Sequence, residues 1–399
     1  MFFTMSAVRN VMVSTIYRNK SAMNMQTFSF LAPQVVFGVK SAENIGEHIT
    51  RMGAKHVLLV SDRGLEKAGL VDQLRAWIGK ANVTITTYTD IEPEPSVDNV
   101  RACVNFARLA GCDLVVGMGG GSAMDSAKVV AALLGNDGDI MDYLGQNKIP
   151  HKGAPTILLP TTAGTGSEIG RGALFYVPER HSKEAVFSSH MLTDLALIDP
   201  VLALSAPASV TASSGLDALC HAIESYTGRA ANPLSMPFAE LGIKWIGKYL
   251  APAVADGSNL EAREGMALGC LYASIALANA NTHAVHALAY PLQGKNRIVH
   301  GKANSVLLPY VLKALAPSLP EKFANIASWM NLAQGVSLVE GITRLSEQIG
   351  IPAKMSAMGV TVSQLEDLTQ EAVQIRRLLD NCPVVLDGVQ IQAIYQDSL

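Results

Sequence analysis

The sequence predicts an α/β half with a doubly wound parallel sheet, followed by an all-helical half. From about residue 34 to 200, short continuous apolar runs alternate with segments of helical length, as in a parallel sheet covered on both faces. After about Asp199–Pro200, turn residues thin out and long stretches with a 3.6-residue apolar period take over. A chain of 399 residues also exceeds the roughly 250–300 residues that one core supports, so two domains are expected.

The expected elements follow from the same patterns. Strands are predicted at residues 34–37, 56–61, 83–88, 113–117 and 156–160, with helices over 70–78 and 99–109. In the second half, helices are predicted over residues 213–227, 236–250, 260–280, 301–315, 337–349 and 363–379. We expect the α/β domain to span residues 28–204 and the helical domain residues 205–399, with a cleft between them.

Residues 1–27 are expected to be an extension that is not part of the fold. All charged residues that precede Glu43 are basic. Such an acid-free, basic start is similar to an organelle transit peptide. The stretch lacks a long apolar run and a secretory cleavage pattern, so an upstream extension, with the folded protein starting near Met23 or Met25, is the preferred interpretation.

The composition indicates a compact globular protein rather than a disordered or membrane-spanning one. Apolar residues make up 49% and charged residues 16% of the chain, and the net charge of -3 gives no basic field for nucleic acid. The five cysteines are scattered without CxxC spacing, as in a cytoplasmic protein with reduced thiols. Import into an organelle through the basic extension is the alternative localisation. The charge-free stretch from Gly265 to Gly294 contains polar residues that a lipid-facing helix would not tolerate alone, so no membrane span is expected.

Two glycine-rich loops follow predicted strands. The first, at residues 117–128, holds three consecutive glycines and Ser122 and opens a helix, so its N–H groups suit an anion. The second, at residues 160–168, carries hydroxyls and glycines at the end of the next strand. A tight turn explains either loop alone, but the two together predict a dinucleotide site. Asp62, after the second strand, suits a ribose and favours NAD over NADP, although capping of a helix that starts at Gly64 is equally consistent with its spacing.

The stretch from Gly215 to Tyr226 contains an acid and a histidine at helical spacing. Asp217 and His221 are four residues apart, so on a helix they stand on one face and offer two metal ligands. His283, His286 and His300 follow in a segment almost free of charge. An isolated Asp-x-x-x-His pair is more often an acidic residue near a helix N-terminus and a histidine packed in the core. Spacing alone does not select among the three later histidines.

With these features the chain resembles the iron-dependent (group III) alcohol dehydrogenase family from about Phe28 to Leu399. The resemblance is carried by GGGSAMDSAK at 119–128, TTAGTGSE at 161–168, GLDALCHAIESY at 215–226 and the segment from 286 to 311. It implies a dinucleotide-binding α/β domain, a helical domain, and a cleft that holds NAD(P) and one divalent metal.

By position, the resemblance implies specific site residues. The expected metal ligands are Asp217, His221, His286 and His300. The expected cofactor-binding residues are Asp62, Gly120, Gly121, Ser122, Thr161, Thr162, Thr165, Lys183 and Leu202. His283 is left with a structural or substrate-lining role, Asp125 and Lys128 are expected to brace the first loop, and Glu224 and Tyr226 to have supporting roles.

The chain departs from the family pattern at three places. Tyr290 stands where many relatives have a second histidine near the nicotinamide, and we expect it to act, if at all, as a hydrogen-bond donor. Gly170 and Gly172 replace polar residues after TGSE. Glu94 replaces an asparagine expected on the adenosine side of the cofactor.

The expected reaction is hydride transfer between a short primary alcohol, or its aldehyde, and NAD(H), with a divalent metal as Lewis acid. Fe²⁺ is implied by resemblance, and Zn²⁺ would suit the same ligands. The alternatives are a specialised hydroxyacid or diol dehydrogenase of the family, or a lyase similar to dehydroquinate synthases. A lyase of that kind would need basic residues in the cleft to bind its anionic substrate, and the sequence of the helical half contains few. We expect small-molecule substrates and a homo-oligomer, a dimer or larger.

Overall fold

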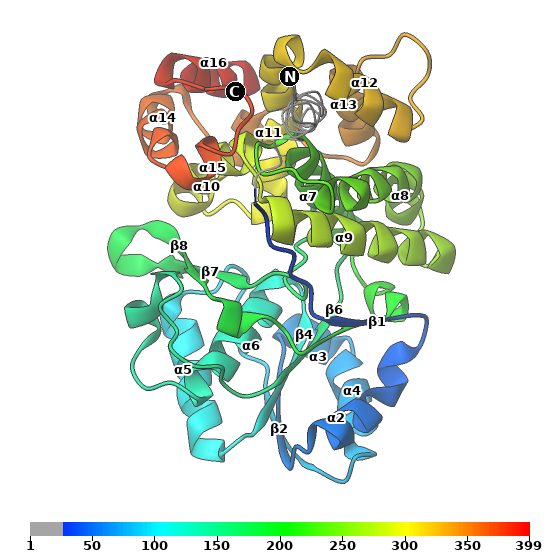
Figure 1. Ribbon diagram of the computed structural model, residues 1–399, viewed down its shortest axis with the longest axis vertical. Helices are drawn as coiled ribbons and strands as arrows, with labels where there is room; N and C mark the ends of the chain where they lie inside the picture. The colour runs from blue at the N-terminus through cyan, green and yellow to red at the C-terminus, as the bar shows by residue number, and fades with distance from the viewer. Residues whose placement is uncertain (1–26) are drawn as a thin grey trace, which may run out of the picture. The chain divides into compact units, whose positions relative to one another are not determined.

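The computed structural model describes residues 27–399, and Leu31–Leu399 forms one compact unit (Figure 1). The extension predicted for residues 1–27 lies, except for Thr27, outside the described residues. The unit consists of an α/β half and a helical half, so the predicted fold class is confirmed.

The α/β half is built on a six-stranded parallel sheet with the order β1-β9-β6-β4-β2-β3. Its strands are β1 (Gln34–Phe37), β2 (His56–Val60), β3 (Thr84–Tyr88), β4 (Leu114–Gly119), β6 (Thr156–Pro160) and β9 (Leu195–Ile198). Five of them match predicted strands. The sixth, β9, has only four residues and lies between β1 and β6, where its apolar sequence is buried on both faces.

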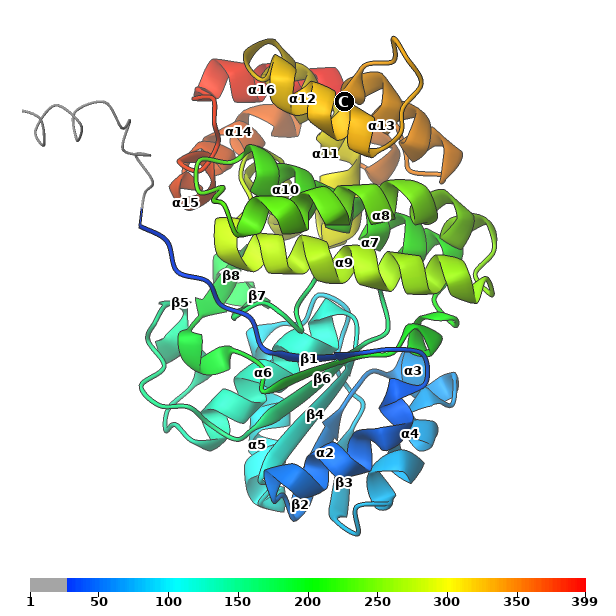
Figure 2. The ribbon, with the colours of Figure 1, turned by 45° about the vertical axis from the view of Figure 1, so that its right-hand side comes forward.

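Helices cover both faces of this sheet (Figure 2). The helices are α2 (Ile45–Met52), α3 (Arg63–Lys67), α4 (Leu70–Gly79), α5 (Val97–Ala110) and α6 (Gly121–Leu134). Side chains of β2 alternate between the two faces: Val57 and Leu59 pack with α2 and α4, whereas Leu58 and Val60 pack with α5 and α6. The alternation explains why this strand is apolar throughout.

A second sheet, which the sequence patterns did not predict, combines one strand before the second glycine loop with two strands after it. It has three strands in the order β5-β8-β7, with bounds β5 (Gly145–Gln146), β7 (Gly172–Val177) and β8 (Ser182–Phe187). β7 and β8 form an antiparallel hairpin, and β8 lies against the helical half at α10. The hairpin therefore brings Lys183 and Phe187 from the α/β half to the helical half.

The helical half contains more helices than the periodicity predicts. They are α7 (Ala208–Thr227), α8 (Ser235–Ala255), α9 (Leu260–Ala280), α10 (Ala284–Asn296), α11 (His300–Leu315), α12 (Pro320–Trp329), α13 (Leu338–Gln348), α14 (Leu365–Val373), α15 (Arg376–Leu379) and α16 (Gly388–Ser398). The single helix predicted over 363–379 is wrong, because the chain leaves helical geometry at Ile375 and splits it into α14 and α15. Short 3-10 turns lie at Ser41–Asn44, Ile140–Tyr143, Pro178–Arg180, Ser189–Met191, Pro200–Ala203, Ala316–Ser318, Met355–Met358 and Val362–Gln364.

The central helix of this half is α7, which is buried along almost its whole length after Val210. It packs against α8, α9 and α11, and it carries the Asp-x-x-x-His pair into the interior. The charge-free stretch from Gly265 to Gly294 forms most of α9 and α10, and none of the helices among residues 27–399 is long and apolar enough to cross a membrane.

Candidate metal and cofactor site

A cleft with a volume of about 1200 Å³ lies where the carboxyl ends of the parallel strands meet the helical half. Loops after β2, β4 and β6 line one side, and α7, α10, α11 and α15 line the other. Ligands of doubly wound sheets bind at this end of the strands.

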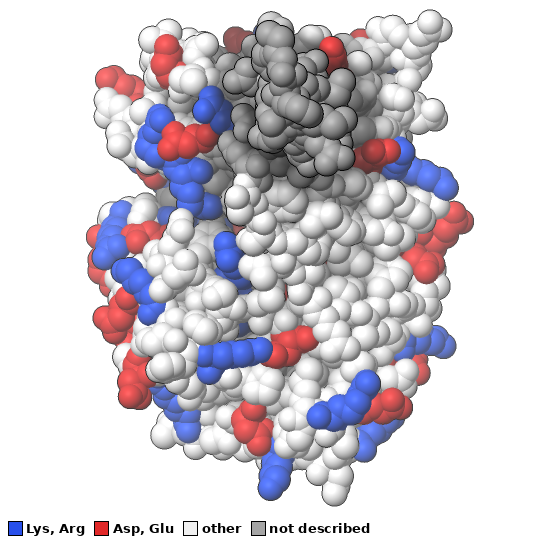
Figure 3. Space-filling view, in the orientation of Figure 1, with Lys and Arg blue, Asp and Glu red and all other residues white. Residues whose placement is uncertain are grey.

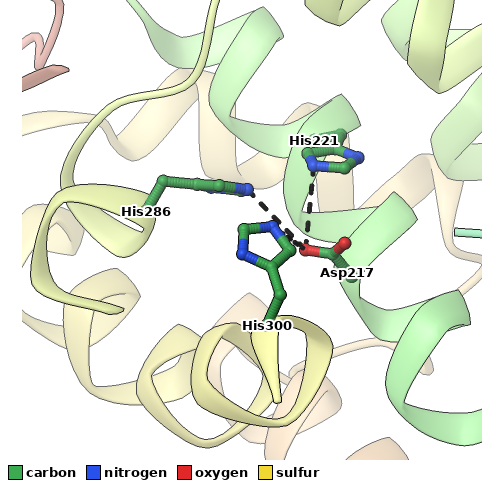
Figure 4. Close-up of side chains that lie close together, drawn as sticks. All are labelled: Asp217, His221, His286 and His300. Carbon is green, nitrogen blue, oxygen red and sulfur yellow. Dashed lines mark ion pairs between the residues drawn. The ribbon is translucent and has the colours of Figure 1, made fainter. Parts of the chain in front are cut away.

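Four of the predicted site residues converge in this cleft (Figure 4). Asp217 and His221 come from α7, His286 from α10, and His300 from the first turn of α11. Nε2 of each of the three histidines lies 3.7 Å from the same oxygen, Oδ1 of Asp217. Asp217, His221 and His286 are buried, whereas His300 is partly exposed.

The spacing and chemistry of these atoms fit a divalent ion. A distance of 3.7 Å is too long for a hydrogen bond, but ligand atoms at about 2.1 Å from a common tetrahedral ion lie about 3.4 Å apart. Oδ2 of Asp217 is buried without a hydrogen-bond partner. Burial lowers the pKa of His221, and lowers that of His300 to about 4, so both imidazoles are neutral at pH 7 and offer lone pairs. Burial opposes ionisation of Asp217, but the surrounding imidazoles outweigh it and lower its pKa.

Asn304 is a member of this site that the sequence analysis missed. Its Nδ2 donates to Oδ1 of Asp217 at 2.7 Å and lies 3.1 Å from Nε2 of both His286 and His300. The residue stands one turn after His300 on α11, so helical spacing from that histidine is the signal that identifies it.

Glu224 and His283 lie behind the four converging residues. The Glu224 carboxylate lies 2.5 Å from Nδ1 of His286 and 3.2 Å from Nδ1 of His283. His283 itself accepts the Ala284 N–H at the start of α10 and contacts Thr227 through Nε2. His283 thus contacts the end of α7 and the start of α10, and it lies outside the group of four converging residues.

His300 is tied to the α/β half through a polar network. Its Nδ1 lies 3.0 Å from Oε1 of Gln293, which also accepts a hydrogen bond from Lys183 at 3.1 Å. Lys183 forms an ion pair with Glu94, whose carboxylate accepts the backbone N–H of His300 at 3.3 Å. Burial opposes ionisation of Glu94, but Lys183 outweighs it and lowers the pKa of that carboxyl. Glu94, which replaces an asparagine of the family pattern, lines the cleft and contacts the backbone of His300.

The first glycine loop forms the start of α6, whose N-cap is Gly120. A Cβ at Gly121 would lie 3.0 Å from the Thr165 side chain, so the glycine allows the two loops to approach each other. The N–H groups of this first helical turn have no partner within the helix and suit a phosphate. Ser122 accepts the N–H of Glu94 and also lines the cleft.

Lys128 and Asp125, both on α6, hold the second glycine loop in place. The buried Lys128 ammonium donates to the carbonyls of Ser167 and Gly170, and also to that of Gly172, and lies 3.0 Å from Asp125. The Asp125 carboxylate in turn accepts from the Ser167 hydroxyl at 2.5 Å. These side chains hold the second loop in place, and Asp125 also lines the cleft.

The remaining predicted cofactor residues differ in position. Asp62 does both things that the sequence allows, because it caps α3 through Oδ1 with the N–H groups of Gly64 and Leu65 and also lines the cleft. Gly120, Gly121, Ser122, Thr162, Thr165 and Lys183 line the cleft as well. Thr161 and Leu202 are buried and do not line it, and Leu202 packs in the core beneath the sheet.

The cleft carries more positive charge from the helical half than the sequence analysis expected. Lys302 on α11 and Arg377 on α15 both line it, beside Tyr290. No local motif marks Arg377 as a site residue, since α15 reaches the cleft only through the fold.

A parallel-sheet half with two glycine loops, facing a helical half with one carboxylate and three imidazoles, defines a class of metal-dependent dehydrogenases. Comparison with known proteins agrees with this class. The model of the iron-containing alcohol dehydrogenase family matches residues 32–200, and the C-terminal model of the same family matches residues 211–399. The chain belongs to the iron-containing alcohol dehydrogenase family, and its function is that of a metal-dependent alcohol dehydrogenase.

Similar proteins cover nearly the whole chain. Long-chain-alcohol dehydrogenase 1 of Geobacillus thermodenitrificans is 40% identical over 90% of this chain and 93% of its own. A crystal structure of a 1,3-propanediol oxidoreductase is 35% identical, with a TM-score of 0.90 over 94% of this chain and 100% of its own. A structure of sulfoacetaldehyde reductase from Bifidobacterium kashiwanohense in complex with NAD⁺ is 29% identical, with a TM-score of 0.86 over 94% of this chain and 99% of its own.

Proposed function

We propose that this protein is an NAD-dependent alcohol dehydrogenase whose divalent metal is held by Asp217, His221, His286 and His300. The observation that carries the proposal is the equal 3.7 Å spacing of three imidazole nitrogens from one oxygen of Asp217. The residues supply one carboxylate and three imidazoles, which suit Fe²⁺ and also Zn²⁺. The family name favours iron.

The chemistry that a divalent ion supplies at such a site is Lewis-acid activation of the substrate hydroxyl, and the chemistry of a nicotinamide is acceptance of a hydride. The chain's own residues hold and orient the reactants. Asp217 supplies the negative charge among the four ligating groups, while Glu224 and Gln293 fix the rings of His286 and His300. Asp217, His221 and His286 are buried, and all three line the cleft, which limits contact of the cluster with bulk water.

The cofactor would lie along the glycine loops. The first turn of α6 suits the pyrophosphate, and Asp62, with Oδ2 not engaged in its helix cap, suits a ribose hydroxyl. A carboxylate at this place repels a 2′-phosphate, which supports NAD over NADP. The NAD⁺ complex of the related sulfoacetaldehyde reductase supports the same choice.

The relatives named above act, by their names, on long-chain alcohols, a diol and a sulfonate aldehyde, so their names leave the substrate class open. We infer a primary alcohol or its aldehyde as substrate and Tyr290 as a hydrogen-bond donor beside it. Tyr290 lines the cleft, and its ring centroid lies 6.5 Å from that of His300. Burial raises the pKa of its phenol, so the hydroxyl keeps its proton at neutral pH.

The test is metal analysis of anaerobically purified protein together with NADH formation from 1-butanol and 1,3-propanediol. We expect about one divalent ion per chain, lost in Asp217→Ala and in His286→Ala together with NADH formation. The control is His190→Gln, an exposed histidine outside the cleft, which is expected to keep both. Unchanged metal content and alcohol oxidation in folded Asp217→Ala protein would refute the site assignment.

A further inference from the structure

Arg377 brings a positive charge to the part of the cleft beside the metal cluster. It lies on the short helix α15 and lines the cleft together with Tyr290, His286 and His300. Figure 3 shows Lys and Arg side chains, with Asp and Glu side chains among them, on the face that carries α15. No step of the reaction proposed above uses this guanidinium.

The charge of Arg377 is not balanced by a carboxylate among the described residues. Among the other cations that line the cleft, Arg63 pairs with Asp90 and Lys183 with Glu94, whereas Arg171 and Lys302, like Arg377, have no ion pair with a described carboxylate. Its neighbour Arg376 pairs with Asp380 and does not line the cleft. An unpaired arginine facing a cleft attracts anions and has donors available for them.

The Arg377 side chain is oriented by the ring of Phe187 and by a hydrogen bond to the Tyr290 hydroxyl, which uses only part of its five N–H donors. The guanidinium carbon lies 4.9 Å from the ring centroid of Phe187, so it rests over the last residue of β8. Stacking on a ring leaves the in-plane N–H groups of a guanidinium free for bidentate binding of a planar or tetrahedral anion. The charge also acts on the hydroxyl of Tyr290, where it opposes the rise in pKa that burial causes.

The position fits recognition of the substrate's far end. Tyr290 stands one turn after His286 on α10, so a molecule that reaches from the histidines to Arg377 passes Tyr290. A substrate with a hydroxyl or carbonyl group near the histidines and an anionic group a few atoms away, near Arg377, would match both ends of this region. A purely apolar alkanol would leave the cation beside it desolvated and unpaired.

We propose that Arg377 binds the substrate through an anionic group, so that the preferred substrates are short alcohols or aldehydes with a terminal carboxylate, sulfonate or phosphate. This inference rests on the proposed function, because it concerns the other end of the same substrate. It assigns to Arg377 a specificity role and gives the hydride-transfer step no new chemistry.

The experiment compares matched probes that differ in charge. The neutral probe is 1,4-butanediol and the anionic probes are 4-hydroxybutyrate and 2-hydroxyethanesulfonate, which separate carboxylate from sulfonate recognition. Steady-state NADH formation gives kcat/KM for each, and calorimetry gives the binding of each to the enzyme–NADH complex without turnover. We expect Arg377→Gln to lower the ratio of kcat/KM for the better anion over the diol by about 10-fold to 100-fold, mainly through KM.

Three comparisons make the result decisive. Arg376→Gln removes an adjacent, paired arginine and is expected to leave the ratio unchanged. Arg377→Lys keeps the charge and is expected to restore part of the ratio. Tyr290→Phe is expected to retain most of the anion preference, and if it abolishes the preference as Arg377→Gln does, Arg377 only positions Tyr290 and the inference is wrong.

Failure of the inference is distinguishable from failure of the proposed function. Oxidation of the diol with no preference for either anion, and an unchanged ratio in Arg377→Gln, would overturn the role of Arg377 alone. Absence of NADH formation from every alcohol would overturn the proposed function. In that case the calorimetric comparison still decides whether Arg377 binds the anions.

Discussion

Oε2 of Glu224 lies 2.5 Å from Nδ1 of His286, and Oε1 of the same carboxylate accepts the Val285 N–H at 2.7 Å. The carboxylate is completely buried, yet His283 and His286 outweigh the burial penalty and lower its pKa to about 2. Glu224 is therefore ionised behind the four converging residues, where it fixes the ring of His286 with Nε2 directed toward Asp217. A carboxylate in this position raises the basicity of a metal-ligating imidazole.

Glu224→Gln is predicted to weaken metal binding about 10-fold to 100-fold, because the amide carries no charge to polarise His286. Chelator competition monitored with Zn²⁺ or Co²⁺ measures this affinity directly. Glu240→Gln on α8, which removes a partly exposed carboxylate paired with Lys244, is the matched control and is expected to bind metal normally. Equal metal affinity in the two variants would contradict the role assigned to Glu224.

Cofactor and metal binding are predicted to be coupled through His300. Lys183 and Glu94 belong to the cofactor half, and Gln293 connects Lys183 to the His300 ring. Thermodynamic linkage then requires that metal strengthens NADH binding by the factor with which NADH strengthens metal binding, typically about 5-fold or more. NADH fluorescence titrations with and without Zn²⁺ measure the factor.

Gln293→Leu removes the acceptor that joins the two sides of this network and is expected to bring the coupling factor close to unity. The variant is informative even when either affinity falls, because the coupling is a ratio of affinities. A coupling factor that stays at the wild-type value in Gln293→Leu would show that the network does not transmit it.

Lys128→Met is predicted to destabilise the protein by about 3–5 kcal/mol, since it leaves Asp125 without its buried counter-charge. The Lys128 side chain is fully buried and also donates to carbonyls of the second glycine loop, which lose these hydrogen bonds. Urea unfolding at pH 7.5 measures the loss, with the exposed Lys148→Met as control. Adding Asp125→Asn to Lys128→Met should recover part of the stability. No recovery would show that the uncompensated charge of Asp125 does not cause the destabilisation.

Five strands of the parallel sheet and the four converging site residues were predictable because their signals are local or belong to a motif. Val57–Val60 shows the apolar run of a strand buried on both faces, and Asp217 and His221 lie one turn apart on one helix. The β7–β8 hairpin was missed because no tight turn signal separates its strands: Pro178–Arg180 forms a 3-10 turn and His181 adopts a positive φ of 48°. Arg377 was not predictable, since only the packing of α15 against α10 brings it beside Tyr290.

Glu168 is predicted to make the protein less stable as the pH rises. Its side chain is buried, and Oε2 has no hydrogen-bond partner. Burial raises its pKa from 4.5 to about 7, so the folded state holds a proton that the unfolded state releases above pH 4.5. Stability therefore falls as pH rises from 4.5 to 7, by about 3 kcal/mol in total for this group.

Glu168→Gln removes this titration at nearly constant volume, so the variant is expected to gain stability over the wild type progressively between pH 5 and about 7 and to keep the gain at pH 8. Urea unfolding of metal-free and cofactor-free protein at each pH gives the difference. Glu179→Gln, at an exposed position, controls for the general loss of one carboxylate. A difference between Glu168→Gln and wild type that does not change with pH would mean that Glu168 is ionised in the folded protein, with an unidentified partner for its buried oxygen.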